Sequence, residues 1–299
     1  MPQKHSEATN LYALFFKVRK KLSETSAGFW SDLEIFSSLN SAQLHIARKS
    51  KCLRKEVTVT TEASTREYDL RNEGFSDIID IAEDGVNFYQ NGTAYNFLEY
   101  VTKKQLNLEF PGWRGVAASV PKRYYYNKAA KTIGLDPLPN SSNAGAYLLI
   151  SGYHKPKVLN AGTAEAGSST TITLATGSSS VPYPKPTDDY YNDLYIEIYG
   201  GTGAGQKAKI TDYDATTRVC TAAFTTAPDS TSIYGMIPEI QEEGHLLMYL
   251  YAIADMWEKG GSRTTLSQSY WRRYFEELGE FIGENLEEDD RILVKETYR

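Results

Sequence analysis

The stretch Leu246–Trp257 (LLMYLYAIADMW) constrains the fold most, because it is apolar on nearly every side when it is read as a helix. A surface helix keeps a polar face, so a helix that is apolar all round has to be buried. Pro238 fits a position in the first turn, and the acidic residues of 239–243 suit the positive end of the helix dipole. We expect a helix that starts near Pro238, ends at Gly260–Gly261 and is covered on most sides by other helices.

Helical patterns near both ends of the chain would supply that cover. Ser31 and Glu34 have the spacing of a capping box, and residues 1–55 as a whole are expected to be helical, with a short amphipathic helix over Leu11–Leu22. Two helix faces are read from residues that recur at helical spacing. The first consists of Leu33, Phe36, Asn40, Gln43, Leu44 and Ala47, and the second of Leu266, Tyr270, Tyr274, Leu278 and Phe281.

Residues 56–159 change to the alternating, β-branched pattern of strands. Segments such as VTVTTE, VPKRYYYN and AYLLISGYHKP are each short and are separated by Gly or Pro. Asn91–Gly92 is a strong hairpin signal between two of these segments. We expect a small antiparallel sheet here.

Residues 160–236 differ in composition from the rest of the chain. They open on NAGTAEAGSSTTITLATGSSS, which is rich in Gly, Ser, Thr and Ala and almost uncharged, and they continue with strand patterns at short intervals. The predicted fold class is therefore α+β. The N- and C-terminal segments form a helical bundle with the small antiparallel sheet (residues 1–159 and 237–299), and residues 160–236 form an inserted all-β domain, sandwich or barrel-like.

The charge, the cysteine count and the apolar runs of the chain argue against several classes of function. The formal net charge of −6 argues against a tight, non-specific grip on nucleic acid, but it suits a wall past which DNA slides. Two cysteines, Cys52 and Cys220, do not make a disulfide framework. The apolar run Leu246–Ala254 is about half of a membrane span, so no membrane association is expected.

No constellation of catalytic, metal-binding or cofactor-binding residues can be defended from the sequence. The run Gly200–Ala208 (GGTGAGQKA) resembles a phosphate loop, but Gln206 stands where that loop has its Lys, and a hairpin turn is the better interpretation. The histidines at 5, 45, 154 and 245 lack ligand-like neighbours. The acidic pairs at 188–189 and 287–290 are typical of a solvated turn and tail. We expect no enzyme activity, no cofactor and no metal.

Two groups of residues are candidates for a partner interface. One is basic and consists of Arg48, Lys49, Lys51, Arg54 and Lys55. The other lies near the C-terminus and consists of Ile292, Leu293, Val294 and Tyr298. The basic group is also explained by solvated helix ends, and the apolar group by folding back onto the chain's own helices. The interface hypothesis is that these residues meet an acidic surface or insert into a neighbour, for example by strand addition.

The order of the segments resembles the head-to-tail adaptor proteins of tailed phages. The residues that carry this resemblance are Trp30–Ile35 with Leu39–Gln43, Glu67–Leu70 with the following IIDI, Pro121 with Tyr124, Leu135–Pro139, and Ile237–Glu239 before the last helices. The segment 160–236 separately resembles small β modules of phage structural proteins, through Gly201–Gln206 and Ile210–Tyr213. The compact adaptors lack such an insert.

The resemblance implies a structural virion protein at the head–tail junction, present in the host cytoplasm during assembly. It implies a homo-oligomeric ring, typically of twelve copies, that sits under the portal protein, docks tail or nozzle proteins and forms part of the channel for genome ejection. DNA would pass without specific binding, and the insert would point outward toward capsid, tail fibres or a neighbouring copy. In a closed ring each subunit uses one face against a different face of the next.

Two other functions remain open. The first is a receptor- or glycan-binding tail component that works through the β insert. The second is a particle-associated hydrolase, which would need catalytic residues that the sequence does not display.

Overall fold

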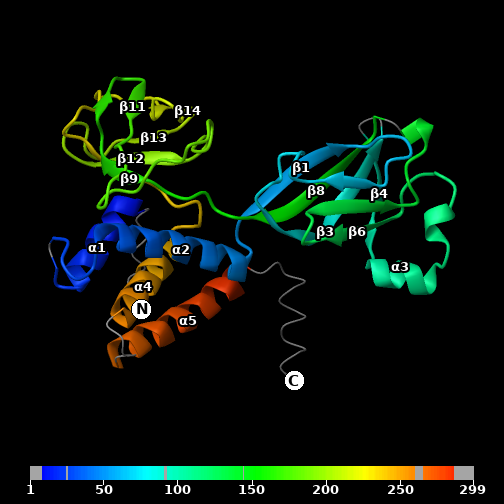
Figure 1. Ribbon diagram of the computed structural model, residues 1–299, viewed down its shortest axis with the longest axis horizontal. Helices are drawn as coiled ribbons and strands as arrows, with labels where there is room; N and C mark the ends of the chain where they lie inside the picture. Colours follow the sequence, from blue (N-terminus) through cyan, green and yellow to red (C-terminus); the bar gives the residue numbers. More distant parts are fainter. Residues whose placement is uncertain (1–8, 25, 91–92, 144, 260–264, 286–299) are drawn as a thin grey trace. The chain divides into compact units, whose positions relative to one another are not determined.

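The computed structural model describes residues 9–24, 26–90, 93–143, 145–259 and 265–285. The fold is mixed α+β (Figure 1), in agreement with the predicted class. Contacts divide the chain into two compact units. One unit contains the described residues up to Cys52 together with those from Pro156 onward, and the other is Leu53–Lys155. Each is described by itself.

The described residues of the first unit form four helices: α1 (Leu11–Lys21), α2 (Asp32–Ser50), α4 (Glu243–Glu258) and α5 (Thr265–Asn285). Helix α4 packs against each of the other three, and residues on several of its sides are buried. This matches the burial expected of its apolar sequence, although Leu246 remains 43% exposed. The predicted last helix is present as α5, which buries Tyr274, Leu278 and Phe281.

The start of α4 differs from the prediction. The helix begins at Glu243 and not near Pro238. The backbone N–H of Glu239 donates to the Gln43 side chain at 3.1 Å, and its carboxylate accepts the backbone N–H of Lys157. The N–H of Ile237 donates to the carbonyl of Tyr195 at 2.8 Å. These bonds hold the segment before α4 in a non-helical conformation. The predicted end of the helix at Gly260–Gly261 lies outside the described residues.

The capping box predicted at the start of α2 is confirmed. The N–H of Glu34 donates to Ser31 Oγ at 3.3 Å, and the N–H of Ser31 donates to the Glu34 carboxylate at 2.9 Å. Together they satisfy two backbone donors that a helix start leaves free. The expected short helix over Leu11–Leu22 is confirmed as α1, which is capped by the Asn10 side chain.

Residues 160–236 form two four-stranded sheets and not a single closed barrel, as far as the described strands show. One sheet has the order β10-β11-β15-β14 and the other β13-β12-β16-β9. The strands are β9 (Ala161–Thr163), β10 (Ala166–Gly167), β11 (Thr171–Thr173), β12 (Tyr195–Gly200), β13 (Lys207–Lys209), β14 (Asp212–Asp214), β15 (Val219–Thr221) and β16 (Ile233–Met236).

The sheet that contains β9 and β16 packs against α1. A side chain at Gly235 would come within 2.6 Å of Asn10 Oδ1 and 2.7 Å of the Tyr12 nitrogen, so the close approach of the sheet to α1 requires glycine there. The Asn10 amide also donates to Glu197 at 2.8 Å. Contacts therefore group residues 160–236 with the helices in one unit. The predicted division into a core of 1–159 with 237–299 and an inserted domain of 160–236 stays a prediction. Whether residues 160–236 fold alone stays a prediction.

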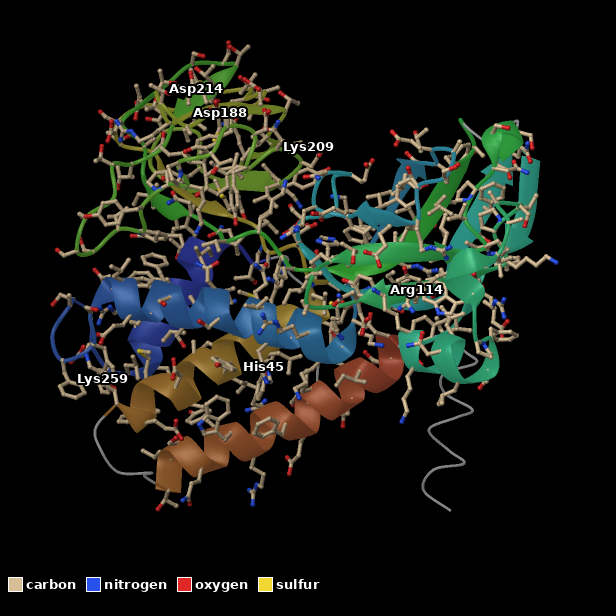
Figure 2. All side chains as sticks on the ribbon, turned by 45° about the vertical axis from the view of Figure 1, so that its right-hand side comes forward. His45, Arg114, Asp188, Lys209, Asp214 and Lys259 are labelled. Carbon is tan, nitrogen blue, oxygen red and sulfur yellow. The ribbon has the colours of Figure 1, made fainter. Side chains whose placement is uncertain are left out.

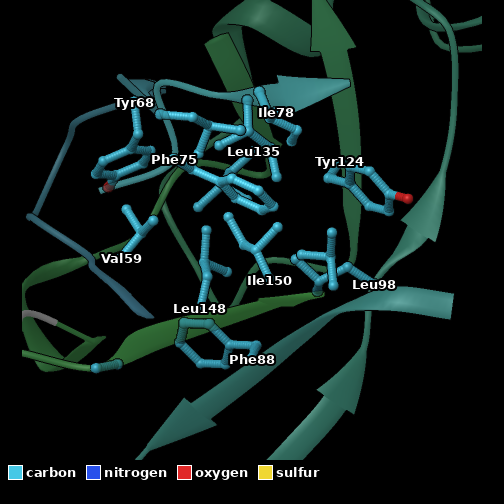
Figure 3. Close-up of a cluster of buried hydrophobic side chains, with 14 residues drawn as sticks. Val59, Tyr68, Phe75, Ile78, Phe88, Leu98, Tyr124, Leu135, Leu148 and Ile150 are labelled. Atoms are coloured by element: carbon cyan, nitrogen blue, oxygen red, sulfur yellow. The ribbon is translucent and has the colours of Figure 1, made fainter. Parts of the chain in front are cut away.

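The second unit contains two further four-stranded sheets, with the orders β1-β8-β3-β4 and β2-β7-β6-β5. Their strands are β1 (Arg54–Thr60), β2 (Glu67–Asp69), β3 (Ile78–Gln90), β4 (Thr93–Phe97), β5 (Glu99–Tyr100), β6 (Arg123–Asn127), β7 (Thr132–Asp136) and β8 (Tyr147–His154). Figure 3 shows the core formed by buried side chains such as Phe75, Phe88, Leu135 and Ile150. The antiparallel pairing of β3 with β4 agrees with the predicted hairpin, whose turn at Asn91–Gly92 lies outside the described residues.

The predicted small antiparallel sheet is thus two sheets, and one pair, β5 with β6, is parallel. Helix α3 (Lys103–Glu109) was not predicted. It begins at a second capping box, formed by Thr102 and Gln105. Among the described residues no helix is long and apolar enough to span a membrane.

We predict that His245 makes the first unit less stable in acid. Burial lowers the pKa of His245 to about 4. Its Nδ1 accepts the backbone N–H of Thr9 at 3.0 Å, and its Nε2 lies 3.3 Å from the Ile240 carbonyl oxygen. Because the unfolded chain binds the proton more readily, stability falls as the pH drops from about 6.5 to 4, by about 3 kcal/mol at most. Chemical denaturation of wild type and His245→Gln across this range measures the effect. An equal acid loss in both proteins contradicts the assignment.

We also predict that Ser31→Ala lowers the free energy of unfolding by about 1 kcal/mol, because it removes one half of the capping box. Ser37→Ala is the matched control, since Ser37 is an exposed residue within the same helix. Urea denaturation of both variants measures the difference. Equal stability of the two variants would show that the cap contributes nothing.

Candidate interaction surfaces

The first three predicted basic residues lie at the C-terminal end of α2. Arg48 and Lys49 are exposed in the last turn, and Lys51 closes the helix in the left-handed conformation, with φ of 53°. This position suits cations, because the C-terminal end of a helix is electronegative. His45 lies one turn earlier, and its pKa is lowered by burial first and then by Lys49 and Arg48.

The other two predicted basic residues belong to β1 and already have partners. Arg54 Nε donates to Ser151 Oγ at 2.7 Å. Lys55 Nζ donates to the Gly74 carbonyl at 2.9 Å and lies 5.8 Å from the centre of the Phe75 ring. Both side chains are nonetheless exposed.

The division between the two units falls between Cys52 and Leu53, so Arg48, Lys49 and Lys51 belong to the first unit and Arg54 and Lys55 to the second. The apolar candidates Ile292, Leu293, Val294 and Tyr298 lie outside the described residues. Their role in an interface remains a prediction.

An aromatic face joins α2, α4 and α5. His45 Nδ1 lies 2.6 Å from the Tyr274 hydroxyl oxygen, and the ring of Tyr251 packs against Trp271 and Tyr274, with centroids 5.0 and 5.4 Å away. Figure 2 shows His45 beside the helices of this unit. Phe275, next to this group, is 56% exposed. Tyr274 is the buried ring of this face, His45, Tyr251 and Trp271 are half-buried, and Phe275 is exposed.

A polar groove of about 450 Å³ lies between α2 and α4. Its polar lining is provided by Glu34, Ser37, Ser38, Ser41, Asp255, Glu258 and Lys259, and Met256 is its apolar member. Ser38 Oγ donates to Asp255 at 2.5 Å, and Lys259, labelled in Figure 2, donates to Glu34 at 2.7 Å. The bond from Lys259 and the bonds from Ser31 lower the pKa of Glu34 to about 2. The groove thus holds three carboxylates and one ammonium group, that of Lys259, so its net charge is negative.

The segment that follows β5 carries a contrasting, basic and apolar surface. Arg66 and Arg114 each lie 4.7 Å from the Trp113 ring, and Arg123 lies 3.8 Å from the Phe110 ring. Cations over aromatic faces are stabilised by the ring quadrupole. Three apolar side chains in the same stretch are exposed, at 70% for Leu108, 40% for Phe110 and 49% for Val116. Figure 2 shows Arg114 beside α3.

Asp136 anchors two of these arginines. Its carboxyl is 1% exposed and lies 2.8 Å from Arg123 and 3.7 Å from Arg66. A buried carboxylate without a cation would be costly, so these ion pairs favour keeping both guanidinium groups close to Asp136. The sequence interpretation missed this surface, because the pairs are distant in sequence. The capping box formed by Thr102 and Gln105 is the local sequence signal from which α3 could have been predicted.

The glycine-rich run Gly200–Ala208 forms the turn between β12 and β13, which pair antiparallel, as the hairpin interpretation predicts. Gly201, Gly203 and Gly205 have φ of 76°, 79° and 86°, a region that favours glycine. Gln206, at the Lys position of a phosphate loop, bonds to the carbonyls of Gly203 and Thr226. The Gln206 side chain therefore stabilises the turn.

The acidic pair Asp188–Asp189 is part of a turn. Asp188 accepts the backbone N–H of Ala215 at 2.9 Å, and Asp189 accepts the Asn192 amide at 2.7 Å. Among the described residues no group of three His, Cys, Asp or Glu side chains is placed to hold a metal ion. His154 lies 3.4 Å from Asp77, and His5 and the acidic run 287–290 lie outside the described residues.

We predict that Lys49 and Arg48 hold down the pKa of His45. Replacing both by alanine raises this pKa, because the positive charges that oppose protonation are removed, while Lys51→Ala leaves it nearer the wild-type value. An NMR titration of the imidazole measures the change. A pKa unaffected by the double replacement would show that the helix end is electrostatically remote from His45.

Comparisons with known proteins bear on the family of this chain. No curated protein matches the chain. Residues 9–169 match the SU10 adaptor protein family, a stretch that runs from the start of α1 through the whole second unit to β10. This match covers more than half of the 299 residues and agrees with the resemblance of the sequence to phage adaptors. The chain therefore belongs to the SU10 adaptor protein family.

Proposed function

We propose that this protein is a non-enzymatic structural component of a tailed-phage particle that forms a ring between the portal of the head and the tail. The family match over residues 9–169 carries this proposal. In this function the protein resides in the virion at the head–tail junction, after assembly in the host cytoplasm. Tail or nozzle proteins dock on the ring, and residues 160–236 contact outer parts of the particle.

Surfaces of opposite chemistry support ring formation. A closed ring uses heterologous contacts, in which one face of a subunit meets a different face of the next. The groove between α2 and α4 is lined by the carboxylates of Glu34, Asp255 and Glu258 and by the ammonium group of Lys259, which leaves it with a net negative charge. The surface around α3 is basic, with Arg114 and Lys104 exposed. Such complementary charges favour correct registration of neighbouring copies and disfavour contacts between like faces.

The overall charge supports a passive role toward DNA. A protein that grips DNA neutralises phosphates with many Lys and Arg side chains, and its binding depends strongly on salt. This chain has a formal net charge of −6. A wall of that sign lets DNA pass without adhering to it.

The proposal predicts a second ring stacked on the portal. The full chain is co-expressed with the portal protein of its phage, the complex is purified by the portal, and it is examined by negative-stain electron microscopy. Because the adaptor seats on the portal, its ring is expected on the portal axis, with outward projections from residues 160–236. A bare portal, with this chain migrating separately as a small oligomer, would refute the adaptor function.

A tail component that binds glycans is the second candidate, and one observation favours it. Residues 160–236 expose three tyrosine rings, with Tyr183 65%, Tyr195 45% and Tyr199 43% exposed. Exposed aromatic rings with a polar tip are common in recognition surfaces. Glycan-array binding by the full chain that is lost in Tyr183→Ala, together with a bare portal, would favour this second function.

A further inference from the structure

Strand β1 leaves one side of a sheet open. It stands at the edge of the order β1-β8-β3-β4, and no other described strand pairs with its outer side. The carbonyl of Leu53 accepts the His154 N–H at 3.0 Å, and the N–H of Thr61 donates to the Ala146 carbonyl at 2.7 Å. Leu53 and Thr61 are both odd-numbered. In the antiparallel register with β8, the backbone N–H and C=O groups of the odd-numbered residues between them therefore also point toward β8. The backbone groups of Glu56 and Thr58 therefore point outward.

The side chains of β1 follow the same alternation. Val59 is buried, Val57 is half-buried, and both face the core, whereas Glu56 and Thr58 on the other face are exposed. Long open edges invite another strand, and proteins protect them with charges or by covering them. The charges of β1 are confined to its first three residues, and its second half carries none.

The C-terminal segment of the chain has a sequence that complements this edge. Aligned in parallel, Asp289-Asp290-Arg291-Ile292-Leu293-Val294 lies beside Arg54-Lys55-Glu56-Val57-Thr58-Val59. Each acidic residue then meets a basic one, Arg291 meets Glu56, and Ile292 and Val294 meet the two valines. Opposite charges and β-branched pairs on one face both stabilise neighbouring strands.

The antiparallel alignment is less favourable. With Leu293 again beside Thr58, it pairs Lys295 with Glu56 and Glu296 with Lys55, but it brings Asp289 beside Glu62. It thus makes two favourable charge pairs and one repulsive pair, against three favourable pairs in the parallel order.

We propose that Asp289–Val294 of one copy adds to β1 of a second copy as a parallel edge strand. The choice of a second copy rests on the proposed function, because a ring needs a contact between two different faces of the chain. Strand addition supplies main-chain hydrogen bonds to Glu56 and Thr58. The apolar side chains of the added strand cover Val57, which the core of the second unit leaves half-exposed.

The test is a disulfide between Thr58→Cys and Leu293→Cys, placed on separate full-length chains of different mass in a Cys52→Ser background. The two chains are mixed in the presence of the portal protein and mildly oxidised. The expected product is a mixed dimer of the two chains. The matched control is Thr58→Cys with Ile292→Cys, whose side chains lie on opposite faces, and we expect roughly tenfold less of its dimer.

Charge exchange tests the direction of the strand. Glu56→Lys lowers the yield of the mixed dimer, and Arg291→Glu on the other chain restores it if the strands are parallel. Restoration by Lys295→Glu in place of Arg291→Glu overturns the parallel order.

Equal cross-linking in the control pair, or cross-linking only within a single chain that carries both cysteines, overturns the strand exchange. A chain shortened to end at Asn285 separates the inference from the proposed function. If that chain still forms the portal-bound ring, strand exchange is not the ring contact and the adaptor function stands. If the full-length chain forms no ring on the portal, the adaptor function itself fails.

Discussion

The need to cover α4 on nearly every side organises the first unit. A helix with Leu247, Met248 and Ile253 on different sides is stable in water only when other elements remove those sides from solvent. Each fully buried side chain of this size contributes about 1.5–3 kcal/mol. The cover comes from α1 and α2, more than 190 residues earlier, and from α5. This one constraint brings α1 and α2 together with α4 and α5.

The same arrangement leaves the chemically distinctive surfaces outside the core. The acidic groove lies where α2 and α4 meet, and the basic end of α2 lies at the last turn of a helix whose other side is packed. In the second unit Asp136 pairs with two arginines near exposed apolar residues. Membership of a family of phage structural adaptors makes assembly the natural use of such surfaces.

Local signals made the helices and most strands predictable. The capping box at Ser31, the periodicity of α5 and the turn at Gly200–Ala208 all act over a few residues, so the sequence displays them directly. The start of α4 was predicted wrongly, because Glu239 is held by Gln43 and Lys157, which are distant in sequence. The surface around α3 was missed for the same reason, since Arg66, Arg123 and Asp136 meet only in the folded sheet.

The most direct test of the adaptor account is the mass of the complex with the portal protein. Native mass spectrometry of the full chain bound to its portal gives the number of copies of each. The account predicts one fixed, closed complement of this chain per portal ring, twelve on the family expectation. A variable number of bound copies, or a portal with none, would contradict it.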